Sequence, residues 1–386
     1  MLEGEGMKVV IVIDSFKGSL SSLEAGQAAG EGIRRVFPDA VTQVCPLADG
    51  GEGTVETLIS GMGGTIRELP VTGPLGETVN GRYGILEDKT TAVIEMADAA
   101  GITLVLPEKR NPLYTTTYGV GETIRDAIKE GCRKFIIGIG GSATNDGGVG
   151  MLQALGFDFL DREGQSVPYG AQGLEKLADI RTEHALQELR ACEFHIACDV
   201  KNVLCGSEGC SAVFGPQKGA DDAMIHRMDE WLANYAALAA ACSSGADPNY
   251  PGSGAAGGLG FAFRTFLGGS LEPGVELILG ETKLEQKLRD ADIVITGEGR
   301  LDGQTVMGKA PIGVAALAKK YSKRVLAFSG CVTEDARACN EHGIDAFFPI
   351  VRGAVSLEEA MERTNAARNM ADTAEQVFRL LSSCKQ

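Results

Sequence analysis

The sequence predicts an α/β protein with two domains built around mostly parallel sheets. The chain has 386 residues, a length typical of two ordinary domains. Short apolar, β-branched runs recur along it and are typical of buried strands. Segments with helical spacing of apolar residues separate these runs. Strands that alternate with helices favour parallel sheets.

The predicted strands are short runs rich in Val, Ile and Phe, each ending in a polar or glycine-rich stretch. The run KVVIVI at the start of the chain and FIIGI near the middle are the clearest examples. In chain order the predicted strands cover residues 8–13, 41–47, 91–96, 135–139, 194–198, 292–296, 325–328 and 345–348.

The predicted helices show apolar residues on one face and carry start signals. Ser21 or Ser22 is placed to cap the first, with Glu24 in its first turn, and Lys309 opens a later one with Pro311 in its first turn. In chain order the predicted helices cover residues 22–35, 54–62, 115–129, 149–155, 221–242, 277–289, 309–321, 334–341 and 357–381.

Two stretches are predicted to be irregular. Residues 61–87 are rich in Gly, Pro and Thr, and the strong loop signal at 72–76 predicts the first domain boundary. Residues 243–260 contain many glycines and fit either a mobile, ligand-shaping loop or a solvated linker.

Charge and hydropathy exclude two classes of partner. The formal net charge is −16, from 36 Lys and Arg against 52 Asp and Glu, whereas nucleic-acid binding needs a basic surface. No apolar run approaches the roughly 18 residues that a membrane span requires. No signal peptide is visible, and residues 1–6 before Met7 are interpreted as an extension.

Ten cysteines are scattered without a CxxC pair, which is typical of reduced, mostly buried thiols in a cytoplasmic protein. The group Cys192, Cys198, Cys205 and Cys210 is the one candidate for zinc. Its irregular spacing favours structural thiols instead.

Polar loops follow several predicted strands, where open α/β sheets place ligands. Residues 140–148 (GGSATNDGG) join a strand to a helix N-terminus, a common anion-binding arrangement, and the alternative is a tight turn capped by Asp. Lys17 in residues 14–19 suits phosphate or carboxylate, unless it is only a solvated loop lysine. Residues 49–53 repeat the Asp-Gly-Gly-x-Gly pattern of residues 146–150, which indicates a similar task for both loops.

The standard motifs are only loosely matched. Gly138-x-Gly140-x-x-Ala143 fits a weak dinucleotide fingerprint. Residues 303–310 nearly match a P-loop, but Ala310 stands where Ser or Thr must hold Mg²⁺, and the predicted strand ends well before Gly303. None of the four His lies in a polar glycine loop, which argues against a Ser-His-Asp hydrolase. Several loops bearing Asp, Glu, Lys, Ser and Thr instead suit phosphoryl transfer with Mg²⁺ held by carboxylates.

Five motifs, in this order, resemble the bacterial glycerate kinases of the type I family. They are DSFKGS at 14–19, PLADGGEGT at 46–54, GGSATNDGG at 140–148, Cys198-Asp199 and TGEGRLDGQT at 296–305. The resemblance runs from about Met7 to the final helix.

The resemblance implies an enzyme that phosphorylates D-glycerate with ATP and Mg²⁺. The product in this family is typically 2-phosphoglycerate, although the sequence does not choose the hydroxyl. It also implies two α/β domains flanking a ligand cleft: a discontinuous terminal domain, residues 7–75 plus 290–386, and a flavodoxin-like middle domain, residues 76–289. The expected partners are ATP and D-glycerate, without nucleic acid or membrane, and homo-oligomerisation is left open.

The site residues are expected from the matching motifs, except Lys309, which the near P-loop at 303–310 places where phosphate could be met. Lys17 and Arg300 are candidates for meeting phosphate or carboxylate, and Asp199 and Asp302 for holding the metal or accepting the hydroxyl proton. Each further acid either contacts ligand or only shapes its turn. The candidates for binding substrate or nucleotide are Asp14, Ser15, Ser19, Asp49, Gly50, Glu52, Gly140, Gly141, Ser142, Thr144, Asn145, Asp146, Glu298, Gln304, Thr305 and Lys309.

Two other functions remain open at this point. An NAD(P)-dependent oxidoreductase of a small hydroxy acid would use residues 138–143 for its dinucleotide. A non-catalytic regulator that binds a nucleotide or sugar acid would keep the loops but show no turnover.

Overall fold

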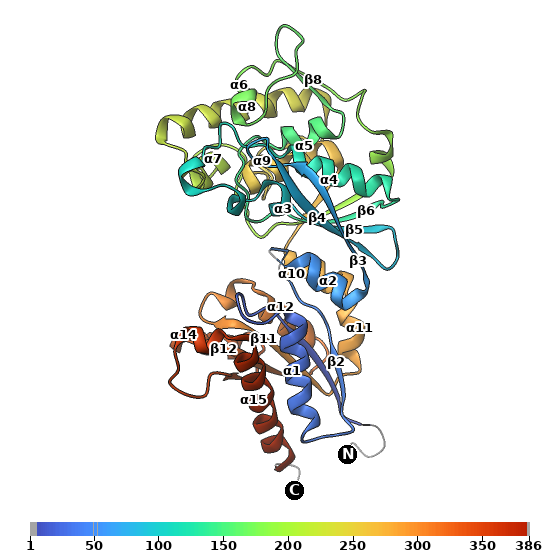
Figure 1. Ribbon diagram of the computed structural model, residues 1–386, viewed down its shortest axis with the longest axis vertical. Helices are drawn as coiled ribbons and strands as arrows, with labels where there is room; N and C mark the ends of the chain where they lie inside the picture. The colour runs from blue at the N-terminus through green and yellow to red at the C-terminus, as the bar shows by residue number, and fades with distance from the viewer. Residues whose placement is uncertain (1–5, 49, 52, 384–386) are drawn as a thin grey trace. The chain divides into compact units, whose positions relative to one another are not determined.

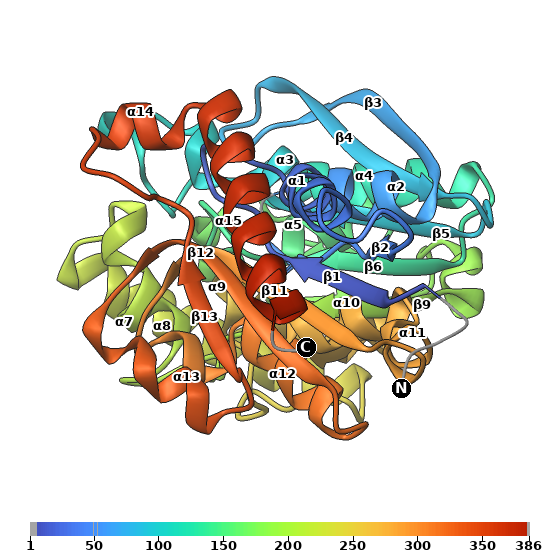
Figure 2. The ribbon, with the colours of Figure 1, turned by 90° about the horizontal axis from the view of Figure 1, so that it is seen from below.

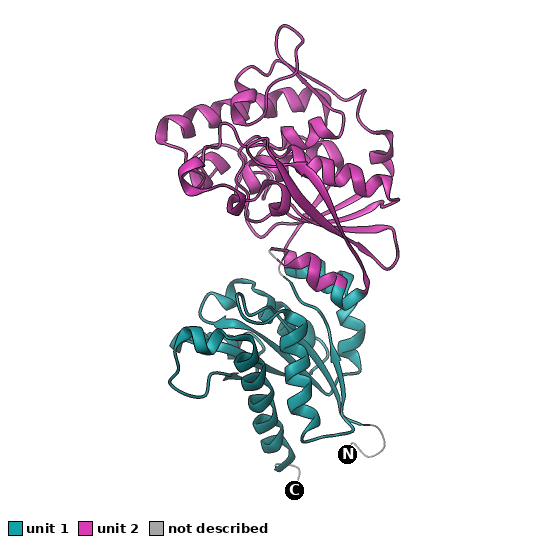
Figure 3. Cartoon of the chain, viewed as in Figure 1, with its two compact units in different colours: residues 1–49, 60–62, 275–386 teal, residues 50–59, 63–274 magenta. Residues whose placement is uncertain are grey.

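The computed structural model describes residues 6–48, 50–51 and 53–383. The chain divides into two compact units, shown in Figure 3. Unit 1 comprises residues 1–49, 60–62 and 275–386, and unit 2 comprises residues 50–59 and 63–274. Both contain helices packed on a sheet with mostly parallel strands, as the sequence predicts. No helix within the described ranges is long and apolar enough to cross a membrane.

Unit 1 contains a five-stranded parallel sheet. Its strand order is β13 (Ala346–Pro349), β12 (Arg324–Val332), β11 (Ile293–Leu301), β1 (Lys8–Ile13) and β2 (Val41–Val44). Because neighbouring side chains on a strand point to opposite faces, Val9 and Ile11 enter one core and Val10 and Val12 the other.

Helices cover both faces of this sheet. The helices α1 (Ser22–Arg34) and α15 (Arg363–Ser383) lie side by side on one face, and α12 (Ala310–Lys319) covers the other (Figure 2). The α1 helix is capped by Ser21, one of the two caps that the sequence predicts, and Ser21 and Glu24 form a capping box in which each side chain bonds to the other residue's backbone N–H. The remaining helices of unit 1 are α10 (Gly274–Glu281), α11 (Leu284–Arg289), α13 (Ala338–Glu341) and α14 (Leu357–Met361).

Unit 2 contains a six-stranded mixed sheet (Figure 1). Its order is β10 (Ser270–Glu272), β9 (Glu193–Ala197), β6 (Lys134–Gly138), β5 (Thr91–Glu95), β4 (Thr78–Leu86) and β3 (Gly64–Thr72). The first four are parallel, and β4 and β3 are antiparallel to their neighbours. A separate two-stranded sheet joins β7 (Asp158–Leu160) to β8 (Asp179–Arg181).

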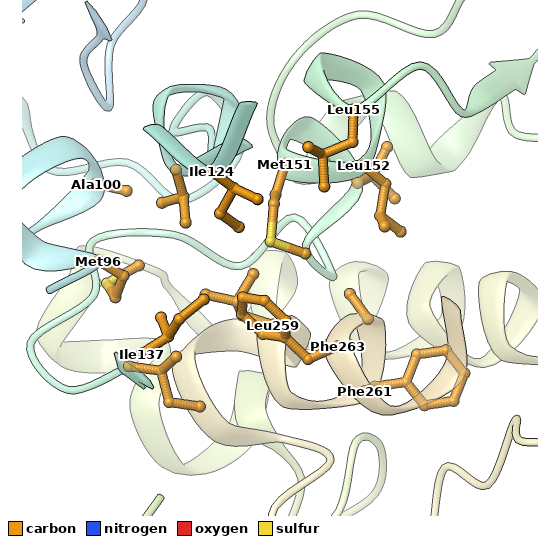
Figure 4. Close-up of a cluster of buried hydrophobic side chains, with 14 of the residues drawn as sticks. Met96, Ala100, Ile124, Ile137, Met151, Leu152, Leu155, Leu259, Phe261 and Phe263 are labelled. Carbon is orange, nitrogen blue, oxygen red and sulfur yellow. The ribbon is translucent and has the colours of Figure 1, made fainter. Parts of the chain in front are cut away.

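The core of unit 2 lies between this sheet and its helices. Figure 4 shows Met151 and Leu152 of α5 in one buried cluster with Leu259 and Phe263 of α9 and Ile137 of β6. The helices of unit 2 are α3 (Ala97–Ala100), α4 (Tyr118–Lys129), α5 (Val149–Ala154), α6 (Ala171–Glu175), α7 (Cys210–Phe214), α8 (Asp222–Cys242) and α9 (Ala255–Leu267). The helix α2 (Thr54–Met62) begins in unit 2, and its residues 60–62 count with unit 1.

The division of the chain differs from the predicted boundaries near residues 75 and 290. Residues 61–87, interpreted as irregular, form a hairpin in which β3 pairs with β4 along its whole length. This pairing places β3 in the sheet of unit 2, so the division falls earlier, at residues 49–50. The strand order of unit 2 is also sequential, unlike the flavodoxin-like order, which reverses direction beside its first strand.

Other predicted segments also have different bounds in the structure. The strand expected at 292–296 continues to Leu301, because its polar residues pair in register with β12. The helix expected at 277–289 is broken at Lys283, whose φ is +49°, into α10 and α11. The stretch at 243–260 was predicted to be irregular, and α9 begins within it at Ala255, but Ala256, Gly257 and Gly258 have left-handed φ values of 52°, 68° and 94°, so irregular backbone continues to Gly258.

Candidate functional site

The carboxyl ends of β1 and β11 meet where the sheet of unit 1 changes direction. The two strands are neighbours, but β1 leads to β2 on one side and β11 leads to β12 and β13 on the other. The Asp14 N–H donates to the Gly297 carbonyl oxygen at 2.9 Å and joins the two strand ends. Open α/β sheets bind ligands at such a switch point.

A cluster of charged side chains extends from the end of β11 at this point. The Lys309 Nζ lies 3.8 Å from a Glu298 carboxylate oxygen and 3.6 Å from an Asp302 carboxylate oxygen. The Arg300 Nε lies 3.4 Å from the other Asp302 oxygen. The Thr305 hydroxyl donates to Glu298 at 2.7 Å. We call Glu298, Arg300, Asp302, Thr305 and Lys309 the β11 cluster.

The carboxylates of the β11 cluster are held differently. Glu298 is only 9% exposed, and burial raises the pKa of its carboxyl, which Thr305 and the charges of Lys309 and Lys17 oppose. The Asp302 side chain is 15% exposed, against 12% for the side chain of Glu298, and it accepts a hydrogen bond from the Gln304 N–H at 3.0 Å. The cluster therefore combines two largely buried acids with two cations.

The loop after β1 lies next to this cluster. A Cβ added to Gly299 would lie 3.6 Å from the Phe16 Cα, so the chain around Lys17 passes close to β11. Lys17 is exposed. Asp14 accepts a hydrogen bond from the Ser15 N–H, and the Ser19 hydroxyl is buried with no partner within the described part of the chain.

β11 continues through residues 297–301, beyond the predicted strand end at residue 296. Glu298 pairs in register with Ser329, and Arg300 with Cys331. The strand therefore ends at Leu301, directly before Asp302 and Gly303, and not well before Gly303 as predicted. Ala310 remains the reason against a P-loop, because it lacks the hydroxyl that would hold Mg²⁺.

In unit 2, Asp146 occupies the place where the loop after β6 was expected to bind an anion. Its side chain is fully buried and accepts from the Thr117 N–H at 2.8 Å, the Gly148 N–H at 3.1 Å and the Gly150 N–H at 3.3 Å. Burial raises the pKa of this carboxyl, and these donors lower it. The α5 N-terminus thus holds the chain's own carboxylate, and Asp146 shapes the loop in this structure.

Only the two glycines that begin this loop are exposed. Gly140 and Gly141 are exposed, whereas Ser142 is buried, with 7% of its surface exposed. Thr144 and Asn145 are fully buried, and the Asn145 amide donates to the Ser211 hydroxyl at 2.8 Å.

A buried carboxylate also lies at the N-terminus of α2, which follows the related stretch of residues 49–53. Asp49 and Glu52 lie outside the described residues, whereas Gly50, with φ +83°, has its Cα so close to Ala197 that an added Cβ would be 2.3 Å away. The buried Glu95 accepts from the Val55 N–H at 2.8 Å and the Gly53 N–H at 3.2 Å at the start of α2. Burial raises the pKa of Glu95 to about 7.

Asp199 follows β9 in unit 2 and is exposed. One carboxylate oxygen accepts a hydrogen bond from the Gly274 N–H at 2.9 Å. The described residues contain no group of three or more His, Cys, Asp or Glu side chains that could hold a metal. Cys192, Cys198, Cys205 and Cys210 are free thiols.

Two buried charged residues escaped the sequence analysis. Glu95 lies at the end of an apolar strand, and Lys218 lies in the loop Pro-Gln-Lys-Gly, where a lysine is ordinarily solvated. The strand-end position of Glu95, which it shares with Asp199, was the one available signal.

Comparisons with known proteins agree on one family. The profile described as "Glycerate kinase family" matches residues 9–382. The chain is 48% identical to "Glycerate kinase" of Bacillus subtilis (strain 168), over 96% of this chain and 97% of the relative. It is 47% identical to "Glycerate 2-kinase" of Escherichia coli (strain K12), over 95% and 98%. A crystal structure described as glycerate kinase 2 from Salmonella typhimurium LT2 matches with a TM-score of 0.92 at 47% identity, covering 99% of this chain and 100% of that one.

Proposed function

Because the chain belongs to the glycerate kinase family, we propose that it transfers the γ-phosphoryl group of ATP to a hydroxyl of D-glycerate, giving 2-phosphoglycerate. The position of the β11 cluster at the switch point of unit 1 is the structural observation that carries this proposal. The 2-hydroxyl is favoured because the relative from Escherichia coli is named a glycerate 2-kinase.

The cations of unit 1 suit the negative charge of both substrates. Phosphoryl transfer depends mainly on positioning and on neutralising the phosphate oxygens. Lys17 and Lys309 would meet phosphate oxygens, and the planar guanidinium of Arg300 suits a two-pronged grip on a carboxylate. Arg300 is exposed, and its Nε lies 3.4 Å from an Asp302 carboxylate oxygen, so its guanidinium is accessible to a ligand.

The donor set of the β11 cluster fits Mg²⁺. Asp302 and Glu298 offer carboxylate oxygens, which this ion prefers and shares with phosphates. Lys309 lies between the two carboxylates and holds them in place. Mg²⁺ bound at Asp302 would neutralise charge on the phosphate oxygens.

Asp199 is our candidate for accepting the proton of the glycerate hydroxyl. Its carboxylate is exposed at the end of β9, and the bond from the Gly274 N–H fixes one oxygen. From the loop after β6, the exposed Gly140 and Gly141, with the largely buried Ser142 that follows them, would contact nucleotide or glycerate. The buried Thr144, Asn145 and Asp146 would support that loop from within.

The competing functions have less support. A dinucleotide needs its pyrophosphate at a helix N-terminus, and the carboxylate of Asp146 fills that place at α5. A non-catalytic regulator remains testable by turnover alone.

The nine described cysteines are free, which supports a reducing, cytoplasmic location.

The decisive experiment is a coupled assay of ADP release with D-glycerate, L-glycerate, tartronate and simple sugars. We expect Mg²⁺-dependent ADP release with D-glycerate above all others. Phosphorus NMR of the product would distinguish 2-phosphoglycerate from 3-phosphoglycerate. No ADP release with D-glycerate would refute the proposed function, and reduction of NAD(P)⁺ by a hydroxy acid would replace it.

A further inference from the structure

A fully buried lysine supports the loop after β6 directly behind its exposed glycines. Lys218 is 2% exposed and ends the 3₁₀ helix η4 (Pro216–Lys218). Its Nζ donates to the Ser142 Oγ at 2.8 Å and to the Thr144 carbonyl oxygen at 2.6 Å. Burying an ammonium costs free energy unless hydrogen bonds replace its water. Both replacements come from the loop, so Lys218 is an internal part of it.

The backbone around Lys218 is fixed. Gly219 has a φ of +92°, and a Cβ at this position would lie 2.2 Å from the Arg110 carbonyl oxygen. Only glycine fits there without displacing the chain. The lysine therefore approaches Ser142 from a rigid turn.

Lys218 remains mostly an ammonium at neutral pH. Burial lowers the pKa of its amino group to about 8, and the neighbouring Cys210 and Asp146 oppose the shift. Asp146 supplies the nearby negative charge from the same loop. The donors that surround Asp146 favour its ionised form.

The charge of Lys218 determines the role of the Ser142 hydroxyl. An ammonium group only donates, so the Ser142 Oγ must accept in their hydrogen bond. Among the described residues, no hydrogen bond is donated by this hydroxyl. Its proton is therefore available, and a hydroxyl that accepts from a charged donor becomes a better donor itself.

We propose that Lys218 is a positioning residue that fixes the Ser142 hydroxyl as a hydrogen-bond donor to an anionic oxygen of a bound substrate. That oxygen belongs either to a phosphate of the nucleotide or to the carboxylate of glycerate. The exposed Gly140 and Gly141 precede Ser142 and leave the backbone open to the same group. This inference rests on the proposed function.

The test compares Ser142→Ala, Lys218→Met and the double variant with the wild-type enzyme. The KM values for ATP and for D-glycerate are measured separately, together with kcat and Tm. Lys176→Met, at an exposed lysine of the same unit, is the matched control. An effect of the two single variants on the same KM identifies which substrate supplies the oxygen.

We expect Ser142→Ala to raise one of the two KM values about 10-fold or more, because a hydrogen bond to a charged group is lost. Lys218→Met should raise the same KM by a similar factor. In the double variant the same KM should exceed that of the more impaired single variant by no more than about threefold, since the two residues act as one unit.

Three results would overturn the inference. Lys218→Met could lower only the Tm and leave both KM values unchanged, which would mean that Lys218 has a purely structural role. The two single effects could multiply in the double variant, which means that Lys218 acts independently of Ser142. If Lys218→Met does not fold, unchanged KM values in Ser142→Ala would overturn the inference on their own. A wild-type enzyme inactive on glycerate would instead refute the proposed function, which separates the two failures.

Discussion

At the scale of single residues, the buried carboxylates of unit 2 act on the protein's own backbone. Asp146 binds N–H groups at the starts of α4 and α5, and Glu95 binds those at the start of α2. Helix N-termini attract negative charge, and here the chain supplies it internally. The exposed glycines and Ser142 are then presented on loops that these carboxylates hold.

Asp146→Asn should destabilise unit 2 strongly. The amide loses the charge and turns an NH₂ group toward backbone donors, which leaves buried N–H groups unpaired. We expect a loss of about 3–5 kcal/mol in the free energy of unfolding. Urea unfolding followed by Trp231 fluorescence measures it, because Trp231 is the only tryptophan and lies in α8 of the same unit.

Asp161→Asn is the control for this prediction. Asp161 also accepts backbone N–H groups, from Glu163 and Gln165, but at an exposed turn. The Asp161→Asn substitution should lower the free energy of unfolding by less than about 1 kcal/mol. Similar losses in the two variants would mean that Asp146 is not the organising group of its loop.

Asp302→Asn should impair catalysis far more than folding. The side chain is 15% exposed and faces Lys309 and Arg300, so the amide fits but the charge is lost. We expect kcat to fall on the order of 10²-fold, as for a metal ligand or proton acceptor. Glu334→Gln at an exposed nearby acid is the control, and steady-state kinetics with a Tm measurement decide. A kcat within threefold of wild type contradicts the assignment.

The sequence identified most of the β11 cluster but could not rank the acids of unit 2. Glu298, Asp302 and Lys309 were candidates because polar residues follow a strand, and local spacing brings them together. Whether Asp146 faces ligand or backbone depends on packing against Thr117, 29 residues away. Lys218 contacts Ser142 from 76 residues away, and no local pattern encodes that contact.

At the scale of elements, α1 and α15 pack closely because of a glycine. A Cβ on Gly32 would lie 2.0 Å from the Ala371 carbonyl oxygen. Gly32→Ala must therefore push the helices apart, and we expect a net loss of about 1–3 kcal/mol despite the better helix propensity of alanine. Thermal unfolding followed by circular dichroism measures it.

Gly280→Ala in α10 is the matched control in the same unit. A Cβ there meets nothing within 4 Å. The substitution should be neutral or stabilise the protein by up to about 1 kcal/mol. Equal destabilisation by both substitutions would contradict the packing argument.

The N-terminus of α2 should make stability depend on pH through Glu95. Burial raises the pKa of this carboxyl from 4.5 to about 7, so the native state binds its proton more tightly than the unfolded state. The resulting stabilisation is complete below about pH 4.5 and is lost as the pH rises through 7.

Between pH 5 and 8 the wild-type protein should therefore lose on the order of 2 kcal/mol more stability than Glu95→Gln. Urea unfolding across this range measures the difference, with Glu108→Gln at an exposed acid as the control. If the free energies of unfolding of wild type and Glu95→Gln change with pH in parallel, the proposed dependence on Glu95 is wrong.

The sequence predicted strands well where almost every residue of the strand is buried. The strands β1 and β6 are continuous apolar runs and were found nearly residue by residue. The hairpin of β3 and β4 was missed because much of β3 is exposed and polar, and β11 was cut short at its glycines. Those segments are strands only because a neighbouring strand pairs with them, which a single sequence does not reveal.

At the scale of the whole molecule, unit 2 is an insertion into unit 1. Its six-stranded sheet and the core of Figure 4 lie entirely within residues 50–274. The two ends of this segment meet, because a Cβ on Gly50 would lie 3.4 Å from the Gly274 Cα. A segment with its own core and adjacent ends has what a domain needs to fold alone.

We therefore expect a fragment of residues 50–274 to fold by itself. Its urea unfolding should appear as a single cooperative transition of Trp231 fluorescence. The fluorescence should change because the indole is half-buried against the core in the folded state and enters water on unfolding. In the full chain the fluorescence reports on unit 2 alone, whereas circular dichroism reports on both units. Coincident transitions would mean that the units unfold together, and separate ones that each has its own stability. A fragment without a cooperative transition would show that unit 2 depends on unit 1, despite its complete sheet.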